Sequence, residues 1–109
     1  MARPRLCRRI EGMPKATYFK PPAVSVRELS EACLSVEGFE AIRLADLEEL
    51  TMENAASRMG VSRHTFGRIL ADGRKAVADA LVHGRALRIE GGDYELKSSA
   101  VADGQIEKS

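Results

Sequence analysis

Aromatic residues are scarce in this chain, which has two tyrosines, three phenylalanines and no tryptophan. A hydrophobic core must therefore be built mainly from Leu, Ile, Val, Met and Ala, a set that helices accommodate better than β-sandwiches do. The length of 109 residues suits one domain, and a hydrophobic content of 44% is enough for a modest core. We expect a single, mainly α-helical domain.

Cysteine is scarce as well, and long apolar runs are absent. Cys7 and Cys33 are too few and too far apart for a zinc site or a disulfide framework, and reduced thiols are the default in the cytosol. No apolar run approaches membrane-spanning length, and Arg8-Arg9 lacks the apolar stretch that follows a twin-arginine signal. We expect a cytoplasmic protein with no cofactor, no metal ion and no membrane contact. A redox or metal sensor that pairs the thiols of two chains is the weaker alternative.

The net charge of +1 says nothing about a nucleic-acid partner, but the charges are unevenly distributed. Residues 1–20 and 63–75 are basic, whereas residues 28–53 hold eight acids against one arginine. This pattern indicates a polarised surface. A solvated, salt-bridged surface is the plainer explanation of charge runs taken alone.

The chain divides into three parts by composition. Residues 1–23 contain four prolines and predict an extended basic arm, in which residues 6–10 and 16–19 could form short strands. Residues 24–96 form the predicted domain, and the polar, aperiodic residues 97–109 predict a disordered tail.

Three helices are expected in the predicted domain. The first helix begins after the capping residue Ser35 and runs to about Glu49. The second begins after Thr51 and ends at Gly60. The third begins after Ser62 and runs to about His83, before Gly84. The stretch 24–33 is ambiguous, because Val26, Leu29 and Cys33 fit a helical face. The apolar stripes expected to be buried are Phe39, Ile42 and Leu47 in the first helix, Met52, Ala55, Ala56 and Met59 in the second, and Phe66, Ile69, Leu70, Gly73, Val77, Ala80 and Leu81 in the third.

After Gly84 the hydrophobic period changes from that of a helix to that of a strand. Residues 86–90 alternate in polarity and predict a short strand, and Gly91-Gly92 predicts a turn. Residues 93–96 then form a second strand or dock on the body. The arm has two interpretations: it follows a DNA minor groove, or it pairs with residues 86–90 in a small sheet. We favour the sheet for residues 16–20 and DNA contact for residues 3–9.

The segment 50–70 meets the demands of a helix-turn-helix, in which two helices cross closely so that the second can enter a major groove. Ala56 is small where the helices touch, and Gly60 tolerates positive φ at the turn. Val61 packs under the pair, Ser62 caps the second helix, and apolar residues return at 66 and 69 to seat it. An ordinary helical hairpin rarely meets the whole set, so the segment predicts DNA binding.

Two resemblances extend this prediction. Residues 50–81 resemble the fourth region of sigma-70-type transcription factors, which reads promoter DNA. The chain to about residue 96 is similar to a prokaryotic family called domain of unknown function 134, whose members are regarded as DNA-binding proteins. The resemblance to this family rests on Arg-Pro at 3–4, Tyr-Phe-Lys-Pro at 18–21, Glu-Ala-Ile-Arg-Leu-Ala-Asp at 40–46, the block 59–70, and Ala-Leu-Arg-Ile-Glu-Gly-Gly-Asp-Tyr at 86–94.

The sigma resemblance implies which residues face DNA. Arg63, His64 and Arg68 take base-facing positions, and an arginine can bond guanine O6 and N7 together. Two glycines depart from the pattern, since Gly67 offers no side chain in the recognition helix and Gly73 weakens its middle. The further candidate phosphate contacts are Ser62, Thr65, Arg58, Arg74 and Lys75 in the domain and Arg3, Arg5, Arg8 and Arg9 in the arm.

Other functions are less well supported. The histidines and cysteines are scattered, and no phosphate-binding glycine loop or activated nucleophile appears, so we expect no enzyme. The stronger alternative is an interaction module that binds RNA polymerase or another regulator through its sigma-like helices. A single motif of this size binds double-stranded DNA weakly, so we also expect a homodimer.

Overall fold

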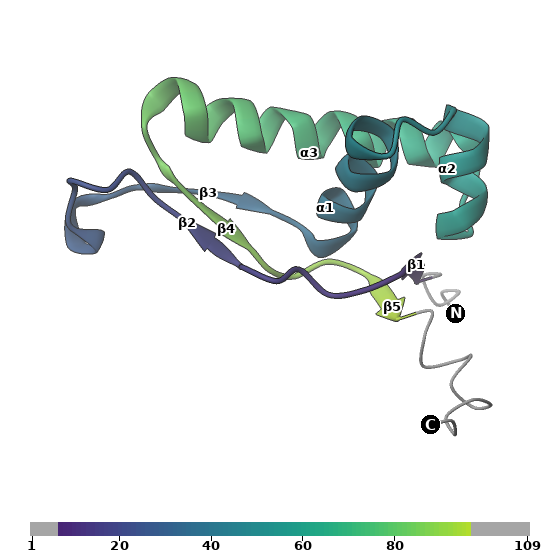
Figure 1. The fold of residues 1–109 in the computed structure, drawn as a ribbon, viewed down its shortest axis with the longest axis horizontal. Helices are drawn as coiled ribbons and strands as arrows, with labels where there is room; N and C mark the ends of the chain where they lie inside the picture. The colour runs from purple at the N-terminus through teal and green to yellow at the C-terminus, as the bar shows by residue number, and fades with distance from the viewer. Residues whose placement is uncertain (1–6, 97–109) are drawn as a thin grey trace, which may run out of the picture.

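The computed structural model describes residues 7–96, which form three α-helices and five short strands (Figure 1). A mainly helical architecture with small sheets was the expectation, and in this coarse form it is confirmed. The predicted disordered tail and the arm residues Arg3 and Arg5 lie outside the described residues. No helix in the described part is long and apolar enough to cross a membrane.

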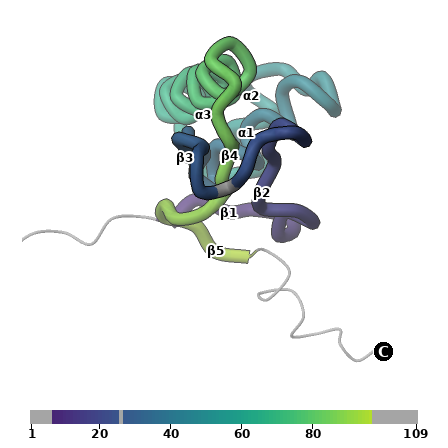
Figure 2. Tube along the Cα trace, turned by 90° about the vertical axis from the view of Figure 1, so that its left-hand side faces the viewer, coloured from purple at the N-terminus to yellow at the C-terminus, as the bar shows by residue number. Residues whose placement is uncertain are grey.

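A three-stranded sheet joins the arm to the end of the domain. Strand β4 (Ala86–Ile89) lies in its centre, between β2 (Tyr18–Phe19) and β3 (Glu31–Leu34) (Figure 2). Strand β2 runs antiparallel to β4, with Tyr18 opposite Arg88, and β3 runs parallel to it. The predicted pairing of residues 16–20 with residues 86–90 is therefore confirmed.

The ambiguous stretch 24–33 is not one helix. A 3-10 turn, η1 (Val26–Glu28), precedes β3, where Ala32 and Leu34 are buried and Cys33 is exposed. Burial of alternate residues is the period of a strand, and this excludes Cys33 from a helical core face.

A second, two-stranded sheet holds the arm to the C-terminal part of the chain. Strand β1 (Arg8–Ile10) runs parallel to β5 (Tyr94–Leu96), so the second-strand alternative for residues 93–96 is confirmed. Ile10 is fully buried and packs in one hydrophobic cluster with Leu34, Val36 and Ile89. The arm therefore contributes to the core.

The first helix is interrupted. Helix α1 (Val36–Ile42) continues into a π-helical turn, η2 (Arg43–Leu47), in which the Glu48 N–H donates to the Arg43 carbonyl over 2.9 Å. The wider turn rotates the residues after it out of the helical stripe. Leu47, predicted to be buried, is 76% exposed, so that prediction is wrong.

Helices α2 (Met52–Met59) and α3 (Arg63–His83) begin and end where their capping residues predict. Thr51 and Ser62 each accept a hydrogen bond from the backbone N–H three residues later, and Gly60 and Gly84 end the helices with φ of 69° and 67°. Leu81, however, is 78% exposed instead of buried, because it lies at the edge of the stripe in the last turn of α3.

Helix α3 crosses α1 at a pair of glycines. A Cβ atom on Gly73 would lie 3.1 Å from the Gly38 carbonyl oxygen and 3.3 Å from Ile42 Cδ1. Gly73 is therefore explained by close helix packing rather than by flexibility. The crossing fixes α3 against a hydrophobic cluster that α1, η2, α2 and α3 build together: Ala41, Leu44, Ala55, Ala56, Met59, Phe66, Ile69 and Leu70.

Candidate nucleic-acid interface

The turn between α2 and α3 has the geometry that the sequence predicts for a helix-turn-helix. Ala56 is 3% exposed and its carbonyl accepts the Val61 N–H over 3.1 Å, while Gly60 adopts the left-handed conformation. Phe66 is fully buried, and Val61 packs against the same hydrophobic cluster. Each residue singled out for the turn occupies the environment that its role requires.

The first two turns of α3 present their outer face to solvent. Arg63, His64 and Arg68 are exposed and lie around a shallow depression that also touches Met52 and Gly67. The structure therefore brings the three predicted base-facing residues together. A Cβ atom on Gly67 would lie 3.4 Å from Met52 Cε, which is ordinary contact, so this glycine leaves the depression shallow without being sterically required.

The basic residues of α3 differ in their acidic partners. Within the described residues, Arg63, Arg68 and Lys75 make no ion pair. Arg74 instead pairs with Asp46 of η2, at 2.6 Å between Nη2 and Oδ1, and this guanidinium lowers the pKa of the Asp46 carboxyl. A phosphate that approached Arg74 would have to compete with this carboxylate.

The hydroxyl groups at the start of α3 have a structural role of their own. Ser62 Oγ accepts the Thr65 N–H over 3.0 Å, which caps the helix. The Ser62 hydroxyl proton remains available to donate to a phosphate, because the cap uses only the oxygen as an acceptor. The side chain of Thr65 is half-buried, in contrast to the exposed Ser62.

Arg9 of β1 is the arm residue that lies against the motif. A Cβ atom on Gly60 would lie 2.7 Å from Arg9 Nη2, which places this guanidinium directly over the turn between α2 and α3. Arg8 instead approaches Asp93, with 3.7 Å between Nη1 and Oδ2, and is largely covered. Arg8 and Arg9, both predicted to contact phosphate, therefore have different surroundings in the structure.

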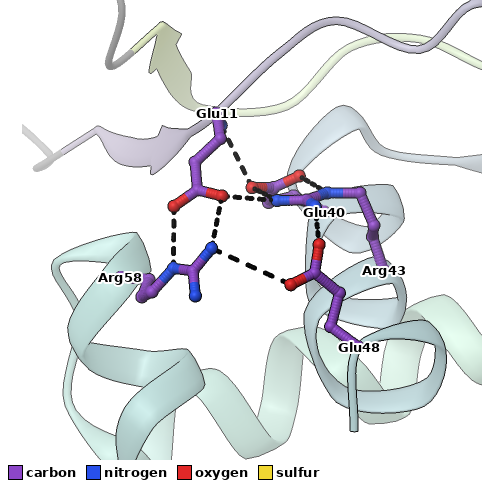
Figure 3. A network of polar contacts seen from close by, with 5 residues as sticks. All are labelled: Glu11, Glu40, Arg43, Glu48 and Arg58. Carbon is purple, nitrogen blue, oxygen red and sulfur yellow. Dashed lines mark hydrogen bonds and ion pairs between the residues drawn. The ribbon is translucent and has the colours of Figure 1, made fainter. Parts of the chain in front are cut away.

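Arg58, a predicted phosphate contact on α2, belongs to an internal network with Glu11, Glu40, Arg43 and Glu48 (Figure 3). Glu11 Oε1 and Oε2 each lie 2.8 Å from the Arg58 guanidinium, and Glu11 Oε1 is 2.7 Å from Arg43 Nη2. These arginines, Arg58 foremost, lower the pKa of the Glu11 carboxyl to about 2.

The network also reaches the interior of the protein. Glu40, 1% exposed, accepts from Arg43 Nε and Nη2 at 2.9 Å and from the Glu11 backbone N–H at 3.0 Å. The hydrogen bonds that Arg43 donates to Glu40 and Glu11 raise the pKa of its guanidinium. No pattern in the sequence predicts this network; its one visible signal is Glu11, the single acid among the basic residues 1–20.

The thiols do not form a recognisable metal site. Cys7 and Cys33 are both free and exposed, and residues 7–96 contain no group of three or more His, Cys, Asp or Glu side chains that could hold a metal ion. The sensor alternative therefore gains no support from geometry within one chain.

Comparison with known proteins places the chain among proteins named UPF0251. The family described as "Protein of unknown function DUF134" matches residues 1–97. A relative from Moorella thermoacetica is 60% identical over 96 residues, which is 88% of this chain and 64% of that protein. One from Desulforudis audaxviator is 55% identical over 95 residues (87% and 62%), and one from Pelotomaculum thermopropionicum is 55% identical over 96 residues (88% and 73%). The matched region is thus less than two thirds of the first two relatives, and no solved structure matches.

Proposed function

The chain belongs to the DUF134 family, and from its geometry we propose that it is a sequence-specific DNA-binding protein, a transcriptional regulator that inserts the start of α3 into a major groove. The observation that carries the proposal is the exposed face of α3 at Arg63, His64 and Arg68. Both arginines lack an acidic partner among residues 7–96, while Arg43, Arg58 and Arg74 are each held by a carboxylate. Cations left unpaired at the start of a recognition helix suit a ligand that supplies the anions.

Arg63 and Arg68 are five residues apart, which places them about 140° apart around the helix axis, and both line the shallow depression at the start of α3. Each can reach guanine O6 and N7 with two N–H groups. Ser62 at the cap and Arg9 beside the turn flank this pair on one side, and Lys75 lies farther along α3. In the proposed complex these flanking groups contact phosphates, which fixes the register of the reading residues.

A second candidate function is the binding of RNA polymerase or another regulator. The observation in its favour is the exposed Leu47, which lies close to the exposed Glu49 and between Asp46 and Glu48, the partners of Arg74 and Arg43. An exposed leucine with acidic neighbours suits a partner with a basic rim and an apolar pocket. The two functions use different surfaces and are compatible.

The test is selection of bound sequences from random DNA, followed by mobility shifts on the selected site. We expect Arg63→Ala and Arg68→Ala each to reduce discrimination for that site by about 1–3 kcal/mol. Arg27→Ala is the matched control, because it removes an exposed arginine of η1 that has no ion pair in the described part. Equal binding by all three variants, or the absence of any selected sequence, would refute the proposal.

A further inference from the structure

An apolar groove lies between the last turns of α3 and strands β2 and β4. Phe19, Val77, Leu81 and Leu87 line it, and its volume is about 450 Å³. The groove lies at the end of α3 remote from Arg63. The DNA-binding surface described above therefore does not use it.

The walls of this groove also protrude. Phe19 is 52% exposed and Leu81 is 78% exposed, although both line the groove, and the adjacent Val82 is 75% exposed. Large apolar side chains gathered at one end of a small protein mark an interaction site. This surface carries both a hollow and apolar side chains that could fill the hollow of a second copy, the two elements that a two-fold contact pairs.

The charges at the rim already have partners. Arg85 donates to Asp79 Oδ1 at 3.1 Å and to Ser30 Oγ at 2.9 Å, and Lys20 Nζ donates to the Pro21 carbonyl at 2.8 Å. Covering the groove would therefore leave no guanidinium without an acceptor, which removes a main cost of burying a charged rim.

The ends of the described chain lie away from the groove. Strands β1 and β5 are paired at one end of the molecule, whereas the C-terminus of α3 and the start of β4 lie at the other (Figure 1). The first and last described residues, Cys7 and Leu96, thus lie at the end of the molecule opposite the groove. We propose that the occupant is a second copy of this chain, related by a two-fold axis through the face formed by Phe19, Leu81 and Leu87.

The position of this face also suits the proposed DNA site, and this step rests on the proposed function. About 15 residues of α3 separate the middle of the Arg63–Arg68 pair from Leu81, or about 23 Å at the rise of an α-helix. Two copies that meet at Leu81 can therefore place their reading ends up to about 46 Å apart, and inclined helices reduce this to the roughly 34 Å between successive major grooves. The expected target is an inverted repeat with half-sites one turn apart.

Sedimentation velocity on the full chain tests the interface. We expect a dimer for the wild type and for Leu47→Glu, the matched control in which an equally exposed leucine on η2 is replaced. Leu81→Glu should be a monomer with an unchanged far-ultraviolet spectrum, and Phe19→Ser gives an independent disruption from the opposite wall. A monomeric wild type, or dimeric Leu81→Glu and Phe19→Ser, would overturn the proposal.

Binding to DNA separates this proposal from the proposed function. Leu81→Glu should bind the full inverted repeat about 10²- to 10⁴-fold more weakly than the wild type, but a single half-site equally well. A wild-type dimer that selects no DNA sequence would refute the proposed function and support the dimer. A wild-type monomer that binds a selected site would do the reverse.

Discussion

Glu11 is the residue whose replacement tests the structure most directly. Its carboxylate connects the end of β1 to Arg58 on α2 and to Arg43 on η2, and thereby ties the arm to these two helical segments. Glu11→Gln keeps the shape of the side chain and removes its charge. We expect lower stability at pH 7, because both arginines lose a charged acceptor.

The magnitude follows from the pKa of Glu11. A fall from 4.5 to about 2 corresponds to at most roughly 3 kcal/mol of preferential stabilisation of the charged form. Solvent reaches the network, since the side chains of Glu11 and Arg58 are 23% and 38% exposed, so screening reduces this value. We expect a loss of about 1–2 kcal/mol, equivalent to roughly 4–16 °C in Tm for a domain of this size.

The effect should depend on pH in a defined direction. Because the folded-state pKa is lowered, the contribution of Glu11 is complete above its unfolded value of 4.5 and is lost as the pH falls towards about 2. Urea unfolding followed by circular dichroism at several pH values between 7 and 2 measures this. The difference in stability between the wild type and Glu11→Gln should shrink from pH 5 to pH 2.

Glu28→Gln provides the control, because Glu28 is exposed on η1 and has no ion pair in the described part of the chain. It should unfold like the wild type at every pH. If Glu11→Gln were as stable as the wild type at pH 7, or if the difference stayed constant down to pH 2, the reasoning about this network would be refuted.

Three further predictions follow from the helix contacts. Gly67→Ala should raise the free energy of unfolding by up to about 1 kcal/mol through helix propensity. In Gly73→Ala the added Cβ would lie 3.1 Å from a backbone oxygen of α1, so chemical unfolding should show no such gain and a further loss of about 1–3 kcal/mol. Equal effects of the two variants would contradict the packing account. Asp46→Asn should free Arg74 and steepen the salt dependence of DNA affinity by about 0.9, with stability unchanged within about 1 kcal/mol; an unchanged slope would exclude Arg74 from the interface. Ala56→Leu should lower thermal stability and DNA binding together, since Ala56 is 3% exposed and overpacking costs about 1–3 kcal/mol; a wild-type melting curve would place Ala56 outside the helix contact.

The sequence predicts those parts of the fold that local chemistry determines. Thr51 and Ser62 cap their helices, and Gly60 and Gly84 end them, because each of these residues acts on backbone groups within four positions of itself. The turn of the candidate site was predictable for the same reason, since its demands fall within one short segment.

Features set by distant partners were not predictable in this way. The stretch that becomes β3 has apolar residues compatible with a helix, and pairing with β4, more than fifty residues later, selects the strand. The π-helical turn that exposes Leu47 has no local signal. Arg58 and Arg74 read as free cations in sequence, yet their carboxylates lie 47 and 28 positions away.

These long-range pairs explain how a chain of net charge +1 can present exposed, unpaired cations at the start of α3. Acids of residues 28–53 neutralise several arginines: Asp46 pairs with Arg74, and Glu40 and Glu48 pair with Arg43. Other carboxylates pair with Arg58 and Arg88. No described acid pairs with the start of α3. In the described chain the cations left on this side are few: Arg9, Arg63, Arg68 and Lys75. Contacts from about four cations would give a salt slope of no more than about 3.6 per copy, so nonspecific affinity should be low. Tight binding would then depend on specific base contacts and on a second copy acting together, which is the arrangement that the apolar face at the far end of α3 would provide.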